Sequence, residues 1–232
     1  MTAHAKNKIM FLIGFAAYFS AIWFLWDTPA VYPLKVFVVL LHEISHAMIA
    51  VATGGTIDRI VLDPNQGGAC YCPGGNAFLT LSAGYLGSLA WGGLLISAGQ
   101  VKRINSRWVT GAVGLLVIGL TLAYVRSPFG FWFGLAFGSV LVLGAARLSA
   151  AVNQGILLTL GLTSCLYAIL DIKSDVIDRS SMQSDAAMLA TNFQNLEPEV
   201  RKKEVATALQ EHKPDHWTLE APLGKGGQGL VF

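Results

Sequence analysis

The segment Val31–Thr53 reads VYPLKVFVVLLHEISHAMIAVAT, a run that is long and apolar enough to cross a bilayer. Its middle nevertheless holds His42, Glu43 and His46. Ionisable side chains at membrane depth are costly, so they usually mark a working site. Their spacing is also the H-E-x-x-H pattern, in which two histidines on one helix face bind zinc. The segment therefore predicts a membrane-embedded helix that carries a metal site.

The composition of the whole chain also indicates a membrane protein. Of the 232 residues, 53% are hydrophobic and only 13% are charged, whereas a soluble domain carries about 25% charged residues. The net charge is +2, and no run of charges resembles a nucleic-acid patch. We therefore expect a protein surrounded by the lipid bilayer, located in the plasma membrane, with no nucleic-acid partner.

Apolar runs of the length that a spanning helix needs recur along the chain. They are Ile9–Trp26, Val31–Thr53, Ala77–Ala98, Trp108–Val125, Phe129–Leu148 and Val152–Leu170. The predicted fold class is thus an all-α, multi-pass membrane protein with about six transmembrane helices. In the third run, Ser88-x-x-x-Gly92 is a small-xxx-small pattern, which predicts that this helix packs closely against a neighbour.

The segment between the second and third runs, residues 54–76, is irregular. It combines turn residues with strand-favouring ones such as Ile60 and Val61. We expect a short β-hairpin or a re-entrant loop, which within the membrane must be covered by protein or line a wet cavity. The same segment contains Cys70-x-Cys72, a lone C-x-C that is a weak zinc signal.

The H-E-x-x-H residues suit the chemistry of a zinc hydrolase. Residues four apart lie on one face of a helix, so His42 and His46 can bind the same ion at about 2.0–2.1 Å. Glu43 lies beside the first ligand, and its expected role is to take a proton from the attacking water and pass it to the leaving amine. Zinc itself would activate the water and polarise the carbonyl group.

A catalytic zinc site needs a third protein ligand and an open fourth position. No further histidine lies in the apolar runs, so this ligand should be a carboxylate at membrane depth. Asp171, which ends the last apolar run, is the preferred candidate, and Asp175 is the runner-up. The alternative for both is an ordinary helix-end aspartate in the headgroup region. Asn153 is a candidate oxyanion donor, although an interhelical hydrogen bond is the preferred explanation for this residue.

The motifs together resemble the site-2 protease superfamily, in particular its compact branch without a PDZ domain. The resemblance covers about residues 30–190. It rests on His42-Glu43-Ile44-Ser45-His46-Ala47, Thr53-Gly54-Gly55, Gly67-Gly68, Ala83-Gly84-Tyr85-Leu86-Gly87-Ser88, the stretch from Tyr167 to Asp175, and Ser184-Asp185-Ala186.

The resemblance implies a zinc endopeptidase that hydrolyses peptide bonds in or near the transmembrane helices of client proteins. It implies that His42 and His46 bind zinc and that Glu43 is the catalytic carboxylate. The Asn…Pro…Leu-Asp-Gly signature of better-known members, which supplies their third ligand, is missing here. The choice of Asp171 therefore rests on position and chemistry.

We expect three parts along the chain. Residues 1–171 form the membrane-embedded metalloprotease domain, and residues 172–215 form a polar, helical tail. Within the final part, 216–232, the sequence GKGGQGLV at 224–231 fits G-x-G-x-x-G-x-V and resembles the start of a protein kinase domain. The other kinase motifs are missing, so this part is either the truncated start of such a domain, in a fragment of a longer fusion, or a flexible glycine-rich end.

Two functional hypotheses from different classes follow. The first is the zinc-dependent intramembrane endopeptidase. The second is a non-catalytic membrane scaffold or regulator that retains a metal site and holds client helices, which the small-residue packing and the polar tail suit equally well. A transporter would predict inverted repeats with broken helices, and the sequence shows no such symmetry.

Overall fold

The structure is a computed structural model of the chain. It describes residues 3–26, 28–65, 67–101, 103–178 and 184–192. The glycine-rich end at 216–232 and most of the predicted tail at 172–215 lie outside the described residues.

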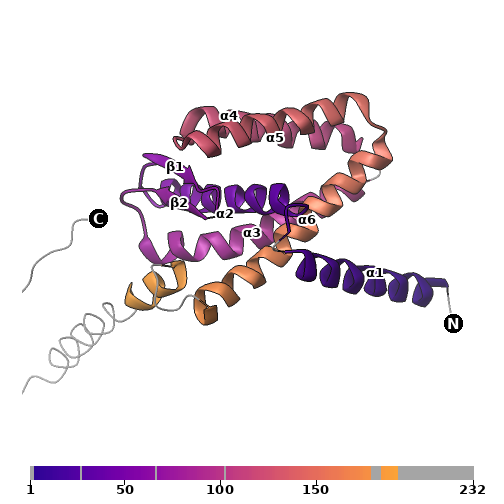
Figure 1. Cartoon of the computed structure of the whole chain (residues 1–232), viewed down its shortest axis with the longest axis horizontal. Coiled ribbons are helices and arrows are strands. Elements are labelled where there is room, and N and C mark those ends of the chain that lie inside the picture. Colours follow the sequence, from indigo (N-terminus) through magenta and orange to yellow (C-terminus); the bar gives the residue numbers. More distant parts are fainter. Residues whose placement is uncertain (1–2, 27, 66, 102, 179–183, 193–232) are drawn as a thin grey trace, which may run out of the picture.

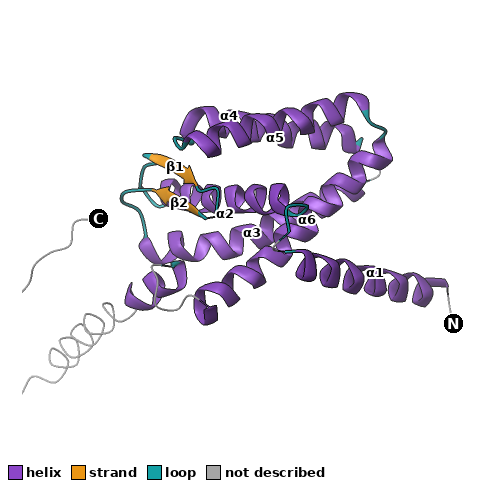
Figure 2. Cartoon of the chain, in the orientation of Figure 1, coloured by secondary structure: helices purple, strands orange, loops and turns teal. Residues whose placement is uncertain are grey.

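Helices make up most of the described chain (Figure 2). They are α1 (Ala3–Leu25), α2 (Tyr32–Ala52), α3 (Ala77–Gln100), α4 (Ser106–Tyr124), α5 (Pro128–Arg147) and α6 (Ala150–Lys173). A π-helical turn, η1 (Ser174–Asp178), follows α6, and residues 185–192 are again helical. The two strands of the described chain, β1 (Arg59–Leu62) and β2 (Gly68–Tyr71), form an antiparallel hairpin.

The predicted all-α, multi-pass fold is confirmed. Among the described residues, the five helices α2 to α6 are long and apolar enough to cross a membrane. The first predicted span, Ile9–Trp26, falls on α1, where the apolar stretch Leu12–Leu25 is shorter than the other spans.

The helix α2 is the centre of the bundle. In its most apolar window 78% of the residues are buried, against 28% in α3, α4 and α5. Figure 1 shows the α4–α5 pair on one side of α2 and α3 on the other, with α6 running obliquely past them. Phe37 of α2 stacks on Phe137 of α5 with ring centroids 5.0 Å apart. The H-E-x-x-H helix is therefore enclosed by protein, while the outer helices keep apolar faces for lipid.

The small residues of α3 allow the close packing that the sequence predicts. Ser88 is fully buried, and its backbone oxygen accepts a hydrogen bond of 2.7 Å from Ser164 Oγ of α6. A Cβ atom at Gly92 would lie 2.6 Å from the backbone oxygen of Gly161 and would overlap Cys165 Sγ. The backbones of α3 and α6 therefore meet at Gly92 with no room for a side chain, as in other small-xxx-small pairs.

The predicted β-hairpin is present and is covered by protein. Ile60 and Leu62 of β1 are each 1% exposed. The turn between α4 and α5 satisfies part of the hairpin backbone: the Arg126 N–H donates to the Ile60 oxygen at 3.0 Å, and the Leu62 N–H donates to Ser127 Oγ at 2.9 Å. Non-helical backbone is tolerated at membrane depth under such cover.

The contact at Gly92 makes a prediction about stability. Gly92→Ala forces a methyl group into the α3–α6 interface, and overpacking of this kind costs about 1–3 kcal/mol. We expect a lower midpoint of thermal unfolding in detergent. Gly93→Ala is the matched control, because a Cβ atom there meets nothing within 4 Å. Equal midpoints for the two variants would contradict the close approach of α3 and α6.

Candidate metal centre

The helix α2 presents two buried imidazoles on one face. His42 and His46 are 4% and 5% exposed, and their ring centroids lie 4.7 Å apart. One helical turn separates the two residues, as the i, i+4 spacing requires. The predicted histidine pair is therefore brought together inside the bundle and faces protein.

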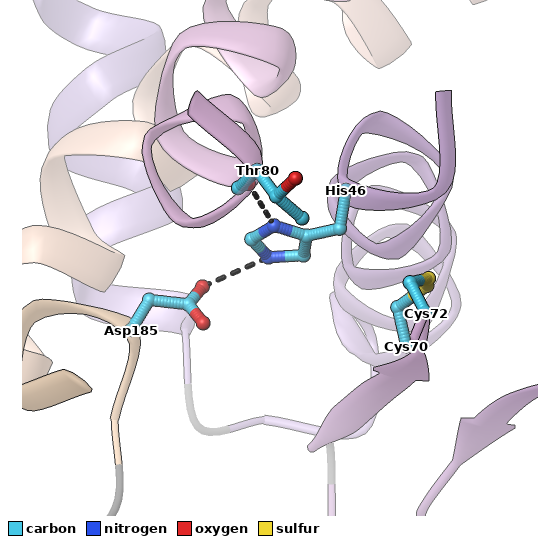
Figure 3. The surroundings of a disulfide bond; sticks show 5 residues. All are labelled: His46, Cys70, Cys72, Thr80 and Asp185. Atoms are coloured by element: carbon cyan, nitrogen blue, oxygen red, sulfur yellow. Dashed lines mark hydrogen bonds and ion pairs between the residues drawn. A yellow bond between two sulfur atoms is a disulfide. The ribbon is translucent and has the colours of Figure 1, made fainter. Parts of the chain in front are cut away.

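A third group meets the histidine pair at the Nε2 atoms. Asp185 Oδ2 lies 2.8 Å from His42 Nε2 and 2.9 Å from His46 Nε2. Figure 3 shows the contact with His46. Asp185 comes from the short helix at 185–192, beyond α6 and η1, so the carboxylate reaches the site from the start of the polar tail.

The arrangement fits a zinc ion. One ligand atom from each of His42, His46 and Asp185 lies within 4.8 Å of the others. Two imidazole nitrogens and one carboxylate oxygen form a common donor set of catalytic zinc sites, which keep a fourth position open. At zinc's bond lengths, tetrahedral ligand atoms stand about 3.4 Å apart, close to the spacing observed here.

The Nδ1 atoms of both histidines face acceptors on the opposite side of the rings. His46 Nδ1 lies 2.7 Å from the backbone oxygen of Thr80, so it donates there and leaves the Nε2 lone pair free (Figure 3). His42 Nδ1 is buried without a hydrogen bond, and Asp171 Oδ2 lies 3.3 Å from it. Partners of this kind fix the orientation of metal-binding histidines.

The structure thus places the two predicted third ligands differently. Asp171 contacts His42, but at Nδ1, the nitrogen that points away from Asp185. Asp175 accepts a hydrogen bond of 2.6 Å from the Tyr85 hydroxyl group. Asn153, the candidate oxyanion donor, has its amide nitrogen 3.3 Å from the backbone oxygen of Gly144 in α5. The interhelical role of Asn153 is therefore confirmed.

Asp185 is held in its ionised form. Burial disfavours its charge, but the hydrogen bonds to His42 and His46 outweigh burial and hold the pKa of the Asp185 carboxyl group below its usual range. A deprotonated carboxylate is the form that binds a metal ion.

Two glycines of α3 make room for this face of α2. A Cβ atom at Gly84 would overlap His42 Nε2 and lie 2.6 Å from His46 Nε2. A Cβ atom at Gly87 would overlap Ser45 Oγ. The sequence Ala83-Gly84-Tyr85-Leu86-Gly87-Ser88 therefore does more than pack helices, because Gly84 keeps the space at both Nε2 atoms open.

The hairpin reaches Glu43. The Glu43 side chain is buried, and a Cβ atom at Gly68 of β2 would lie 2.5 Å from its Oε1 atom. The strand therefore passes directly over the predicted catalytic carboxylate, which requires glycine at this position.

Cys70 and Cys72 take no part in the metal centre. They form a disulfide bond on the hairpin. In Figure 3 they lie on the opposite side of His46 from Asp185. Among the described residues, the group of side chains that could hold a metal ion is His42, His46 and Asp185, and it includes neither cysteine.

Comparison with known proteins decides the family. The sequence model of the family described as Peptidase M50B-like, the site-2 protease family, matches residues 15–198. The chain belongs to this family. No curated protein and no solved structure matches the chain. Membership in the M50B-like family places the chain among the membrane metalloproteases of the site-2 protease type.

The matched region of this M50B-like protein continues past Asp171 and includes Asp185. The sequence carried a signal for Asp185 in Ser184-Asp185-Ala186, one of the motifs that resemble the family. Asp185 follows a polar segment, however, and the expectation of a carboxylate at membrane depth favours a residue of an apolar run.

The contact at Gly84 predicts an effect on metal binding. Gly84→Ala places a methyl group against both Nε2 atoms, so we expect zinc affinity to fall by about 10–100-fold, the range seen when the surroundings of a metal site are disturbed. Zinc titration of the purified protein with a competing chelator measures this. Gly93→Ala on the same helix is the control. Equal zinc affinity in the two variants would contradict this placement of the metal.

Proposed function

We propose that this protein is a zinc-dependent intramembrane endopeptidase that hydrolyses peptide bonds in or near the transmembrane segments of client membrane proteins. One observation carries the proposal: two imidazole nitrogens and one carboxylate oxygen converge within an apolar bundle, next to a second, buried carboxylate. Placing such a set at membrane depth is costly, and ionisable groups there usually mark a functional site. The location in the plasma membrane stays a prediction.

The contacts favour His42, His46 and Asp185 as the zinc ligands. Asp185 faces both Nε2 atoms, whereas Asp171 faces Nδ1 of His42 and Asp175 pairs with Tyr85. In this assignment Asp171 is a positioning residue that holds the His42 ring, like the carboxylates behind many zinc-binding histidines.

The residues divide the chemistry among them. A bound zinc ion polarises the scissile carbonyl group and lowers the pKa of water. Glu43 takes a proton from the water that attacks the carbonyl carbon, and then delivers it to the nitrogen atom as the peptide bond breaks. The enclosure of α2 keeps bulk water out, which strengthens these charge interactions. Asp171 lies near the end of α6, Asp175 on η1, and Asp185 on the short helix at 185–192.

The proposed mechanism makes a prediction about Glu43. Glu43→Gln keeps the size of the side chain but cannot accept the proton, so we expect turnover to fall by about 10²–10⁴-fold, as in other losses of a general base. The assay follows cleavage of a fluorogenic apolar helix peptide by the full chain in liposomes, with zinc content measured in parallel.

Asp58→Asn is the matched control, because Asp58 is an exposed carboxylate paired with Arg59, away from the site. Equal turnover by wild type and Glu43→Gln would remove the mechanism. Stoichiometric zinc without turnover across a set of helix peptides would favour the scaffold hypothesis.

A further prediction distinguishes the role of Asp185 as a zinc ligand from the role of Asp171 as a partner of His42. Asp185→Asn removes a charged ligand, whereas Asp171→Asn removes a partner of a ligand, a change that costs about 10–100-fold in metal affinity. We therefore expect Asp185→Asn to weaken zinc binding more than Asp171→Asn does, in the same chelator competition. The reverse order would restore Asp171 as the third ligand.

A further inference from the structure

Peptide hydrolysis at this site also needs a hydrogen-bond donor for the carbonyl oxygen as it gains negative charge. Asn153 cannot serve, because its amide nitrogen lies 3.0 to 3.3 Å from the backbone oxygens of Gly144, Leu148 and Ser149, at the junction of α5 and α6. The donor must therefore come from the walls around the histidine pair. The need for such a donor rests on the proposed function.

Two tyrosines flank His42. The rings of Tyr85 and Tyr167 both stand edge-on to the imidazole, with centroids 5.6 Å and 5.8 Å from it. The Tyr167 hydroxyl group is hydrogen-bonded to Asp171, which in turn faces His42 Nδ1. Tyr167 thus belongs to the support behind the imidazole, on the side away from Asp185.

Tyr85 comes from α3. It follows Gly84, whose α-carbon faces the Nε2 atoms of both His42 and His46. Its side chain is half-buried, and its hydroxyl group donates to Asp175 Oδ2 at 2.6 Å. Asp175 lies on η1, a π-helical turn of the kind often found at functional sites. Asp175 therefore holds the Tyr85 hydroxyl group, while the Tyr85 ring contacts the metal-binding residue His42.

We propose that Tyr85 is a catalytic residue that donates a hydrogen bond to the carbonyl oxygen in the transition state, and that Asp175 is the positioning residue that holds its hydroxyl group between turnovers. As the carbonyl oxygen gains charge, the Tyr85 O–H turns from Asp175 to that oxygen. The proton stays on the tyrosine, so no bond to hydrogen is broken in this step.

The test is Tyr85→Phe, which keeps the ring against His42 and removes only the hydroxyl group. Loss of one such donor costs about 10²–10³-fold in kcat. We expect this loss with an unchanged KM for a fluorogenic apolar helix peptide and an unchanged zinc content. The same peptide with a phosphinate in place of the scissile amide imitates the charged transition state. Its affinity, measured by calorimetry, should fall by the same factor as kcat.

Tyr18→Phe is the matched control. Tyr18 is also half-buried and hydrogen-bonded, to Thr163 Oγ1 at 2.6 Å, but it lies on α1. Wild-type kcat and phosphinate affinity in Tyr85→Phe would overturn the inference, and so would a loss of zinc or a raised KM in place of a lowered kcat. Failure of the proposed function looks different, because Glu43→Gln would then match the wild type. Phosphinate binding would still test Tyr85 in that case.

Discussion

The structure depends on one polar interaction: a carboxylate oxygen of Asp185 is shared between the Nε2 atoms of His42 and His46 inside an apolar bundle. Charged and polar groups are expensive at membrane depth, so each must find a partner there. The histidines find Asp185 with one nitrogen, and Thr80 or Asp171 with the other. Because every member faces another, α2 can carry these side chains through the centre of the bundle.

The backbones of α3 and β2 approach the polar side chains of α2 closely. Gly84 lets the α3 backbone approach the histidine nitrogens, and Gly68 lets β2 cross over Glu43. Two turns further along α3, Gly92 brings α6 into backbone contact. In lipid, helices associate through van der Waals packing and interhelical hydrogen bonds, so small residues decide where backbones can meet. The packing of the bundle and the shape of the site therefore have the same origin.

Much of the fold could be predicted from the sequence, because spans depend on local composition. The apolar runs match α2 to α6, and the β-branched residues before the third run form the hairpin. The part of the candidate site that lies on α2 could be predicted for the same reason, since His42, Glu43 and His46 share one helix. Asp185 lies in a motif that resembles the family, but a contact across 143 residues leaves no periodic trace that would single it out as the third ligand. The role of Gly84 could not be predicted, because what a missing side chain makes room for depends on the neighbouring helix.

The order of the groups along the chain has a consequence for biosynthesis. The imidazole pair lies on α2, while the carboxylate that meets it is synthesised only after α6. Asp185 is therefore still untranslated when the helix that carries the two histidines is inserted. A nascent chain therefore carries an incomplete set of ligands while its own spans are being threaded. The centre can assemble only once all of these helices are in place.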